Sequence, residues 1–257
     1  IFNKNDFSYL TSIGNFGEGP EEITVMGCLA IDEAHHQLYV SDHAKQKIFS
    51  YDMDSVMVDS LYKPQVKTAM NETLFPSEYQ YINDTLSIAV LIKPTSTSTF
   101  NQFLGRWNMN TGEMIPMKYT HPDIQKKRIT FAASEKAGIY VECYTRHDLM
   151  TICSLDGELL YNIYGPDWDG GNGNKLQSFG TVMIGNDKIF VSYCGEDYAR
   201  DSFPTKILVF DLEGNYLKTL ETGYKISDCC YDSFNNRIIL SLNDVVQFAY
   251  LDIDGII

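Results

Sequence analysis

Basic side chains are scarce in this sequence. Its 257 residues carry 20 Lys and Arg against 34 Asp and Glu, which gives a formal net charge of −14. The one basic run, residues 126–128, is short. A chain this acidic repels phosphate backbones and anionic lipid surfaces. We therefore expect no nucleic-acid partner.

Long hydrophobic runs are also missing. The longest apolar stretches, such as IAVLI at 88–92, have the length of a strand, whereas a transmembrane helix needs about 20 apolar residues. No segment keeps the i, i+3, i+4, i+7 spacing of an amphipathic helix, and β-branched and aromatic residues crowd the apolar runs. We expect an all-β chain without a transmembrane segment.

Motifs of catalysis and metal binding are absent. The sequence contains no nucleophile elbow, no H-E-x-x-H and no phosphate-binding loop. Its six cysteines lack paired C-x-x-C spacing, and several lie in apolar runs, which favours buried thiols. The loop DWDGGNGN at 167–174 departs from the EF-hand order, because Gly171 and Asn172 occupy its fifth and sixth positions. We predict no catalytic residue, no cofactor and no metal site.

What the sequence does contain is a repeat. Five pairs of strand-like runs begin at residues 27, 78, 129, 178 and 226, a period of about 50 residues. Each pair is followed by an apolar strand, a turn bearing Asp or Asn, and then further apolar residues. The segments with this second pattern are SYDMDSVMVDSL at 50–61, RWNMNTGEMIPM at 106–117, ICSLDGELLYNI at 152–163, VFDLEGNYLKTL at 209–220 and YLDIDGII at 250–257.

Four strands repeated at this period predict a β-propeller, in which each blade is a small antiparallel sheet. We expect one domain over residues 1–257 with five four-stranded blades, and six blades as the alternative. The fifth repeat has three strands and a turn, LDIDGII, with no strand after it. The segment DFSYLTSIGNFGEG at 6–19 is predicted to supply that strand and to close the ring.

The opening repeat carries a family resemblance. Residues 13–54, IGNFGEGPEEITVMGCLAIDEAHHQLYVSDHAKQKIFSYDMD, resemble the first blade of NHL-type and TolB-like propellers, and most of all the propeller lipoproteins of Bacteroides and relatives. The resemblance implies six blades and an exported protein of the cell envelope, periplasmic or surface-exposed, with any lipid tether upstream of residue 1. No catalytic residues of the family match positions in this sequence.

Candidate binding residues lie in loops that the propeller topology places on one face. These are the loops between second and third strands and the loops between blades, where binding sites usually occur. Three of them, SDHAKQ at 41–46, YTRHDL at 144–149 and YCGEDYARDS at 193–202, are the richest in polar residues. Their carboxylates, imidazoles, guanidinium groups and phenol could together hold a polar ligand: Asp42, His43, Arg146, His147, Asp148, Glu196, Asp197, Tyr198 and Arg200.

Two functions fit these observations. The first is a non-catalytic module that presents its loops to a protein or glycan ligand in the cell envelope. The second is a hydrolase or lyase that acts on a carbohydrate or lactone at the mouth of the central channel that a ring of blades encloses. Its catalytic carboxylates would be Asp228 and a loop residue such as Glu196 or Asp197. Asp32 and Asp84 belong to first-strand exit turns, which we place on the opposite face.

Overall fold

The computed structural model describes residues 1–59, 61–173, 176–197 and 202–256. The chain divides into two compact units, Ile1–Met117 and Lys118–Ile257, and each unit is considered by itself. A single domain over residues 1–257 stays a prediction. Among the described residues, no helix combines the length and the apolar character needed to cross a membrane.

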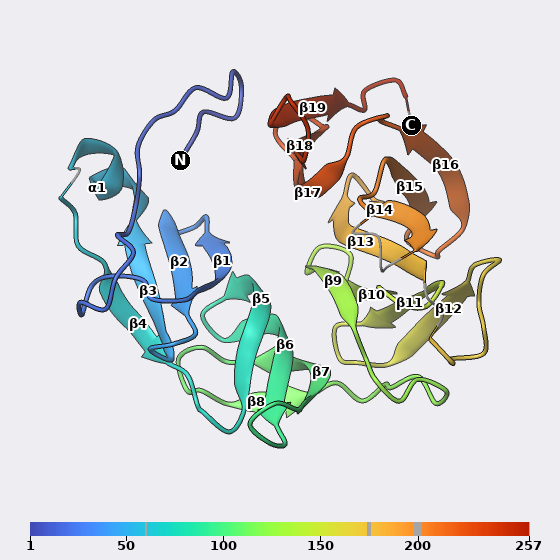
Figure 1. Ribbon diagram of the computed structural model, residues 1–257, viewed down its shortest axis with the longest axis horizontal. Helices are drawn as coiled ribbons and strands as arrows, with labels where there is room; N and C mark the ends of the chain where they lie inside the picture. The colour runs from blue at the N-terminus through green and yellow to red at the C-terminus, as the bar shows by residue number, and fades with distance from the viewer. Residues whose placement is uncertain (60, 174–175, 198–201, 257) are drawn as a thin grey trace. The chain divides into compact units, whose positions relative to one another are not determined.

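The first unit contains two four-stranded antiparallel sheets, each built from strands consecutive in the chain (Figure 1). Sheet 1 consists of β1 (Met26–Asp32), β2 (Gln37–Asp42), β3 (Lys47–Asp52) and β4 (Gln65–Ala69). Sheet 2 consists of β5 (Phe75–Asn83), β6 (Leu86–Pro94), β7 (Phe100–Trp107) and β8 (Met114–Pro116).

The second unit contains three such sheets. Sheet 3 consists of β9 (Ile129–Ser134), β10 (Ile139–Tyr144), β11 (Leu149–Ser154) and β12 (Leu159–Tyr164). Sheet 4 consists of β13 (Leu176–Gly185), β14 (Lys188–Asp197), β15 (Lys206–Asp211) and β16 (Tyr216–Glu221). Sheet 5 has three strands in the described residues, β17 (Ile226–Asp232), β18 (Arg237–Leu242) and β19 (Phe248–Asp252).

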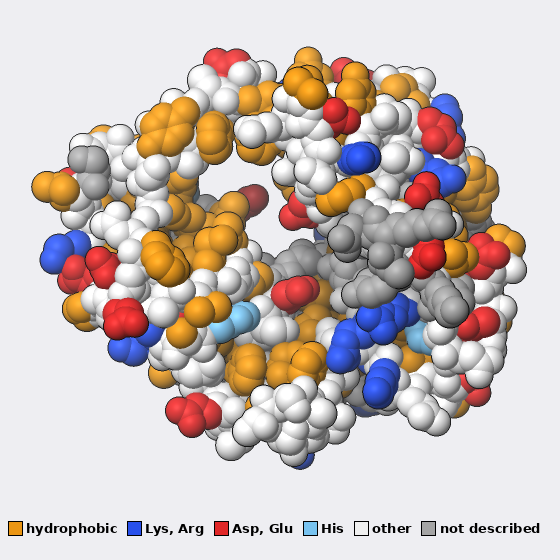
Figure 2. Space-filling model, in the orientation of Figure 1, with side chains coloured by type: hydrophobic (Ala, Val, Ile, Leu, Met, Phe, Trp, Pro, Cys, Tyr) orange, Lys and Arg blue, Asp and Glu red, His pale blue; other side chains and the backbone are white. Residues whose placement is uncertain are grey.

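The five predicted repeats are therefore confirmed as sheets, and the central strands are the most buried part of each. All six residues of β10 are buried, as are five of the six in β11. Apolar side chains also reach the surface. Figure 2 shows several separate hydrophobic patches on the face that it draws, with charged side chains between them. This mixture is ordinary for a globular protein surface.

The second half of SYDMDSVMVDSL was predicted as a strand, and this prediction is wrong. Residues Met53–Val58 form the helix α1, and the fourth strand of sheet 1 is β4, which lies beyond this segment in the chain. The Asp52 side chain caps α1 by accepting a hydrogen bond from the Ser55 backbone N–H at 2.8 Å. Val56 is the buried residue of α1 and belongs to a core cluster with Val40, Phe49 and Tyr51, so the helix is held by apolar packing as well as by its cap.

Residues 6–19 lie outside the named strands. This segment takes part only in isolated bridges, Phe2 with Tyr9 and Phe16 with Ile23. Both bridges pair residues of the N-terminal region with one another. The addition of residues 6–19 to sheet 5, which would close a ring, stays a prediction.

Candidate functional site

The loops at one end of sheet 3 bring part of the predicted binding set together. The turn between β10 and β11 carries His147 and Asp148, and the segment after β12 runs back over it. The Gly165 backbone N–H donates to the Asp148 carbonyl at 2.8 Å, and the Asp167 N–H donates to the Asp148 carboxylate at 3.0 Å. A Cβ on residue 165 would lie 2.0 Å from that carboxylate, so the close approach requires glycine.

An aromatic cluster is formed by side chains from these loops, from the end of β12 and from the segment before β9. We call its members the Trp168 cluster: His121, His147, Tyr164 and Trp168. The Trp168 ring lies 5.0 Å from Tyr164, 5.4 Å from His121 and 6.1 Å from His147, measured between ring centroids. His121 and His147 are almost fully buried, whereas Tyr164 is 49% exposed. The cluster thus has a fixed base and an accessible aromatic edge.

The base of the cluster is tied to the core of sheet 3. Tyr144, the last residue of β10, packs against the His147 ring with a centroid distance of 6.1 Å. Its hydroxyl donates to the buried Glu142 carboxylate at 3.1 Å, and Lys127 donates to the same carboxylate at 2.5 Å. A buried ion pair with additional hydrogen bonds holds its members in one geometry. His147 is therefore positioned by the sheet.

Two buried polar atoms at this site have no hydrogen-bond partner among the described residues. They are Nδ1 of His147 and Oδ1 of Asp169, and they lie 3.9 Å apart, which is too long for a hydrogen bond. Buried polar groups are nearly always paired. A hydroxyl oxygen at about 2.8 Å from each atom would satisfy the hydrogen bonding of both.

Protonation states follow from burial. Burial lowers the pKa of His147 and outweighs the opposing effect of Asp169, so the imidazole is neutral at neutral pH. Its Nδ1 can then donate or accept, depending on the tautomer. Burial raises the pKa of Asp148, the single backbone N–H from Asp167 lowers it less, and the Asp167 charge adds to the increase.

Asp42 takes a structural position in the first unit. Its carboxylate is fully buried at the end of β2 and accepts backbone N–H groups from both sides of the turn. The donors are Thr24 at 2.7 Å, Ala44 at 3.0 Å, Lys45 at 3.1 Å and Val25 at 3.2 Å. Burial alone would raise the pKa of Asp42, but these donors lower it below its usual range. The carboxylate thus fastens the segment before β1 to this turn.

The remaining predicted residues are distributed over both units. His43 belongs to the first unit, where its ring lies 6.2 Å from Phe75. Arg146 is exposed beside His147. Glu196 and Asp197 were predicted in a loop, but they extend β14 and pair with Gln177 and Leu176 of β13, so that prediction is corrected. Tyr198 and Arg200 lie outside the described residues.

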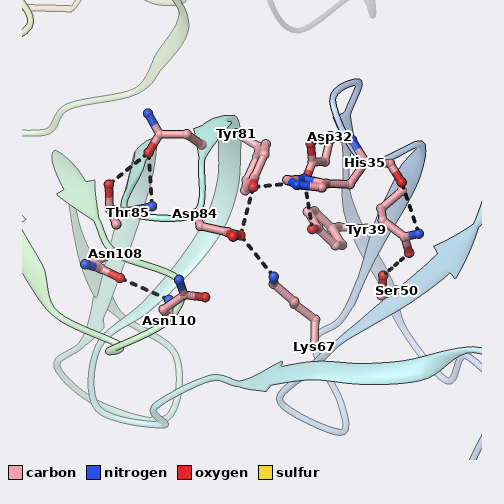
Figure 3. Close-up of polar contacts among 12 residues, drawn as sticks. Asp32, His35, Tyr39, Ser50, Lys67, Tyr81, Asp84, Thr85, Asn108 and Asn110 are labelled. Carbon is pink, nitrogen blue, oxygen red and sulfur yellow. Dashed lines mark hydrogen bonds and ion pairs between the residues drawn. The ribbon is translucent and has the colours of Figure 1, made fainter.

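Asp32 and Asp84, which the sequence places in the turns after the first strands of their repeats, are linked by hydrogen bonds in the first unit (Figure 3). The Tyr81 hydroxyl lies 3.0 Å from the Asp32 carboxylate and 2.9 Å from that of Asp84. It has one proton and donates to one of them at a time. Lys67 donates to Asp84 at 3.0 Å, and Tyr39 donates to Asp32 at 3.2 Å. All these groups come from sheets 1 and 2, so the network fastens two neighbouring sheets.

This network does not resemble a catalytic pair. Burial raises the pKa of Tyr81 far above its usual range, and hydrogen bonds to both carboxylates raise it further, so the phenol stays protonated. Asp32 is only 4% exposed.

The carboxylate considered for hydrolysis, Asp228, accepts the Thr181 hydroxyl at 2.7 Å. Within the described part of the chain, no group of three His, Cys, Asp or Glu side chains is arranged to hold a metal ion.

The sheets and the comparisons with known proteins define the class. Consecutive antiparallel sheets of this kind are the blades of a β-propeller protein. Residues 1–144, more than half of the chain, match the model of a family described as 6-bladed beta-propeller, and the chain belongs to that family. Our count of five repeats agrees with the five sheets, and the family description agrees with the six-blade alternative. No curated protein matches the chain.

Two solved structures with TM-scores above 0.5 share the fold at low sequence identity, and a third structure is similar at a lower score. A chain described as the extracellular domain of a one-component system from B. thetaiotaomicron has a TM-score of 0.56 at 13% identity, over 92% of this chain and 29% of that one. The present chain thus spans less than a third of that relative. A protein of unknown function from Bacteroides caccae has a TM-score of 0.51 at 12% identity, over 90% and 78%. A gluconolactonase from Xanthomonas campestris has a TM-score of 0.46 at 12% identity, over 86% and 84%.

Proposed function

We propose that the protein is a non-catalytic binding module that holds a glycan at the Trp168 cluster. The observation that carries the proposal is the pair of unpartnered buried atoms, Nδ1 of His147 and Oδ1 of Asp169, below a partly exposed aromatic edge. A sugar hydroxyl can donate to the carboxylate and accept from the imidazole at once. The flat faces of Trp168 and Tyr164 supply apolar contact for the ring of the same sugar.

The acidic composition supports a neutral ligand over an anionic one. Asp148, Asp167 and Asp169 belong to two of the three loops that carry the cluster. They repel anionic ligands such as phosphate esters and act as acceptors for hydroxyl groups. A neutral saccharide meets both conditions. Binding without bond chemistry is also consistent with the burial of Asp148, which keeps its carboxylate away from solvent.

Location in the cell envelope is part of the same proposal. It is supported by the resemblance of residues 13–54 to NHL-type and TolB-like propellers, and to the propeller lipoproteins among them. We propose that the protein meets its glycan there, periplasmic or surface-exposed. Detection of the full-length protein in the cytoplasmic fraction of its native cells, and not in the envelope fraction, would contradict this part.

A thermal-shift screen against neutral oligosaccharides, with small organic acids and chelator-treated samples as references, tests the function. A ligand at about 100 times its dissociation constant adds about 2.7 kcal/mol, which raises the melting temperature by about 5–10 °C. We expect a neutral saccharide to produce such a shift. A response confined to the acids, or to divalent cations, would contradict the proposal.

Substitutions then locate the site. Trp168→Ala is expected to weaken saccharide binding by about 10-fold or more in calorimetric titrations, because Trp and Tyr side chains are the residues that most often carry binding energy. The matched control is Tyr216→Ala, which removes a half-exposed aromatic ring elsewhere in the second unit, on β16. Equal loss in both variants, or no loss in Trp168→Ala, would contradict the assignment to the Trp168 cluster. A flat screen together with capture of a protein partner would replace the glycan by a protein ligand.

A further inference from the structure

A pocket lies within the first unit. Its volume is about 500 Å³, within the range of small-molecule sites. Three parts of the first unit line it: the N-terminal segment, the end of β3, and α1 with the residues that follow. The apolar and aromatic lining residues are Tyr9, Ile13, Tyr51, Val56, Leu61 and Tyr62.

One polar atom of this pocket has no partner. Tyr51 is only 1% exposed, and its hydroxyl makes no hydrogen bond within the described ranges. The other two tyrosine hydroxyls are satisfied: that of Tyr9 lies 2.8 Å from Ser12 Oγ, and that of Tyr62 accepts the Asp52 N–H at 3.2 Å. A buried phenol without a partner is costly, so a ligand group that hydrogen-bonds to the Tyr51 hydroxyl would gain binding energy there.

The charges around the pocket restrict its ligand. Its acidic lining residues are Glu21, Glu22 and Asp59, and its basic lining residue is Lys63. Lys63 pairs with Glu21 at 2.7 Å, so acidic charge is left in excess. Such a lining repels anions. Carboxylates together with tyrosine faces attract organic cations, which gain cation–π contact as well as Coulomb attraction.

We propose that this pocket binds a small organic amine whose aromatic or aliphatic body carries a hydroxyl or carbonyl group. The body packs against Ile13, Val56 and Tyr62, and its polar group completes the hydrogen bonding of Tyr51. The ammonium group stays at the acidic rim, near Asp59. This ligand differs from the neutral glycan proposed for the second unit, so either proposal can fail without the other.

Four closely related compounds test the chemistry by isothermal titration of the whole chain. Tyramine has the phenol and the ammonium group; tyrosol replaces the ammonium by a hydroxyl, 4-hydroxyphenylacetate replaces it by a carboxylate, and phenethylamine lacks the phenol hydroxyl. We expect tyramine to bind about 2- to 5-fold more tightly than tyrosol, and the carboxylate to bind most weakly. Removal of the phenol hydroxyl is expected to weaken binding by about 5- to 10-fold.

Tyr51→Phe tests the residue, because the ring stays in place and only the unpartnered hydroxyl is lost. In this variant tyramine is expected to bind no more tightly than phenethylamine. Tyr140→Phe, which removes a fully buried hydroxyl in the second unit, is the matched control and should bind all four compounds as the wild type does. The proposal is overturned if no compound binds, if the carboxylate binds best, or if Tyr51→Phe keeps the preference for tyramine over phenethylamine.

Discussion

Two junctions between neighbouring sheets occupy the same place in the repeat, yet they are built from different chemistry. In sheet 1 the first strand, β1, ends at Asp32, which pairs with Gln37. In sheet 4 the first strand, β13, ends at Gly185, which pairs with Lys188. A tyrosine from the following sheet lies against each of these positions, Tyr81 against the first and Tyr231 against the second.

At the junction of sheets 1 and 2 the tyrosine forms hydrogen bonds. Its hydroxyl lies 3.0 Å from the Asp32 carboxylate, and its ring meets Tyr39 edge to face at 5.2 Å. At the junction of sheets 4 and 5 the tyrosine stacks instead. The Tyr231 ring lies 5.8 Å from Phe190 with an interplanar angle of 13°, and its hydroxyl donates to Asn236 of its own hairpin at 2.7 Å.

The last residue of the first strand explains why one tyrosine forms hydrogen bonds and the other stacks. Asp32 supplies an acceptor that holds the neighbouring tyrosine at its hydroxyl end. Gly185 has no side chain, so the Tyr231 ring can lie directly over its backbone; a Cβ there would be 2.1 Å from the ring. One position in the repeat therefore decides whether two sheets are joined by hydrogen bonds or by stacking.

Of the changes that test this comparison, removal of the Asp32 carboxylate should lower the stability of the protein most. Asp32→Ala leaves the buried Tyr39 hydroxyl without its acceptor and removes one acceptor of Tyr81. Because hydrogen bonds to charged groups contribute about 1.5–3 kcal/mol each, we expect a loss of about 3 kcal/mol in the free energy of unfolding, measured by urea titration. If this variant does not fold, Tyr81→Phe provides the milder test, with an expected loss of about 1–2 kcal/mol. Unchanged stability in both would contradict a stabilising network.

A smaller loss of stability is expected from a substitution at the stacked junction of sheets 4 and 5. Gly185→Ala places a methyl group against the Tyr231 ring, and overpacking of this kind typically costs about 1–3 kcal/mol. The same urea titration measures it. The control is a double-mutant cycle with Tyr231→Ala, in which the cost of the Gly185 substitution should shrink because the clashing ring is gone. A cost that persists without the ring would show that the backbone of Gly185, and not the stacking, is responsible.

The repeat was predictable from the sequence because its signals are local. Turn residues between short apolar runs, as in DLEGN at 211–215, mark hairpins wherever they occur. The side chain and backbone of Asn215 both donate to Asp211, which confirms the turn. The helix α1 was missed because six residues are too few to show a helical period, and only the Asp52 cap indicated its start.

The candidate site was predictable only in part. His147 and Asp148 could be proposed from the sequence because they lie in a polar loop between a second and a third strand. His121 and Trp168 were missed because each is an isolated aromatic residue in its own loop, 47 positions apart. Their meeting depends on how three loops pack over sheet 3, which no local spacing encodes. The Asp32 network was missed for the same reason, since Tyr81 reaches it from another sheet.

The smallest expected effect is the pH dependence of stability, which differs between the two junctions. Burial alone would raise the pKa of Asp32, but hydrogen bonds from His35 and Tyr81 lower it below its usual value of 3.8. Its contribution to stability is therefore complete above the unfolded-state pKa and is lost as the pH falls through the lower folded-state pKa. The position of Gly185 has no titrating group and contributes nothing in this range.

Asp32→Asn tests this dependence, because an amide keeps an acceptor oxygen but does not titrate. We expect the wild type to lose more of its free energy of unfolding than Asp32→Asn when the pH falls from 6 towards 3, as measured by urea titration at each pH. Gly185→Ala should parallel the wild type over the same range, at a lower stability throughout. If Asp32→Asn also parallels the wild type, the acid sensitivity resides in other carboxylates, and the polar junction is held by hydrogen bonds whose strength does not depend on the charge of residue 32.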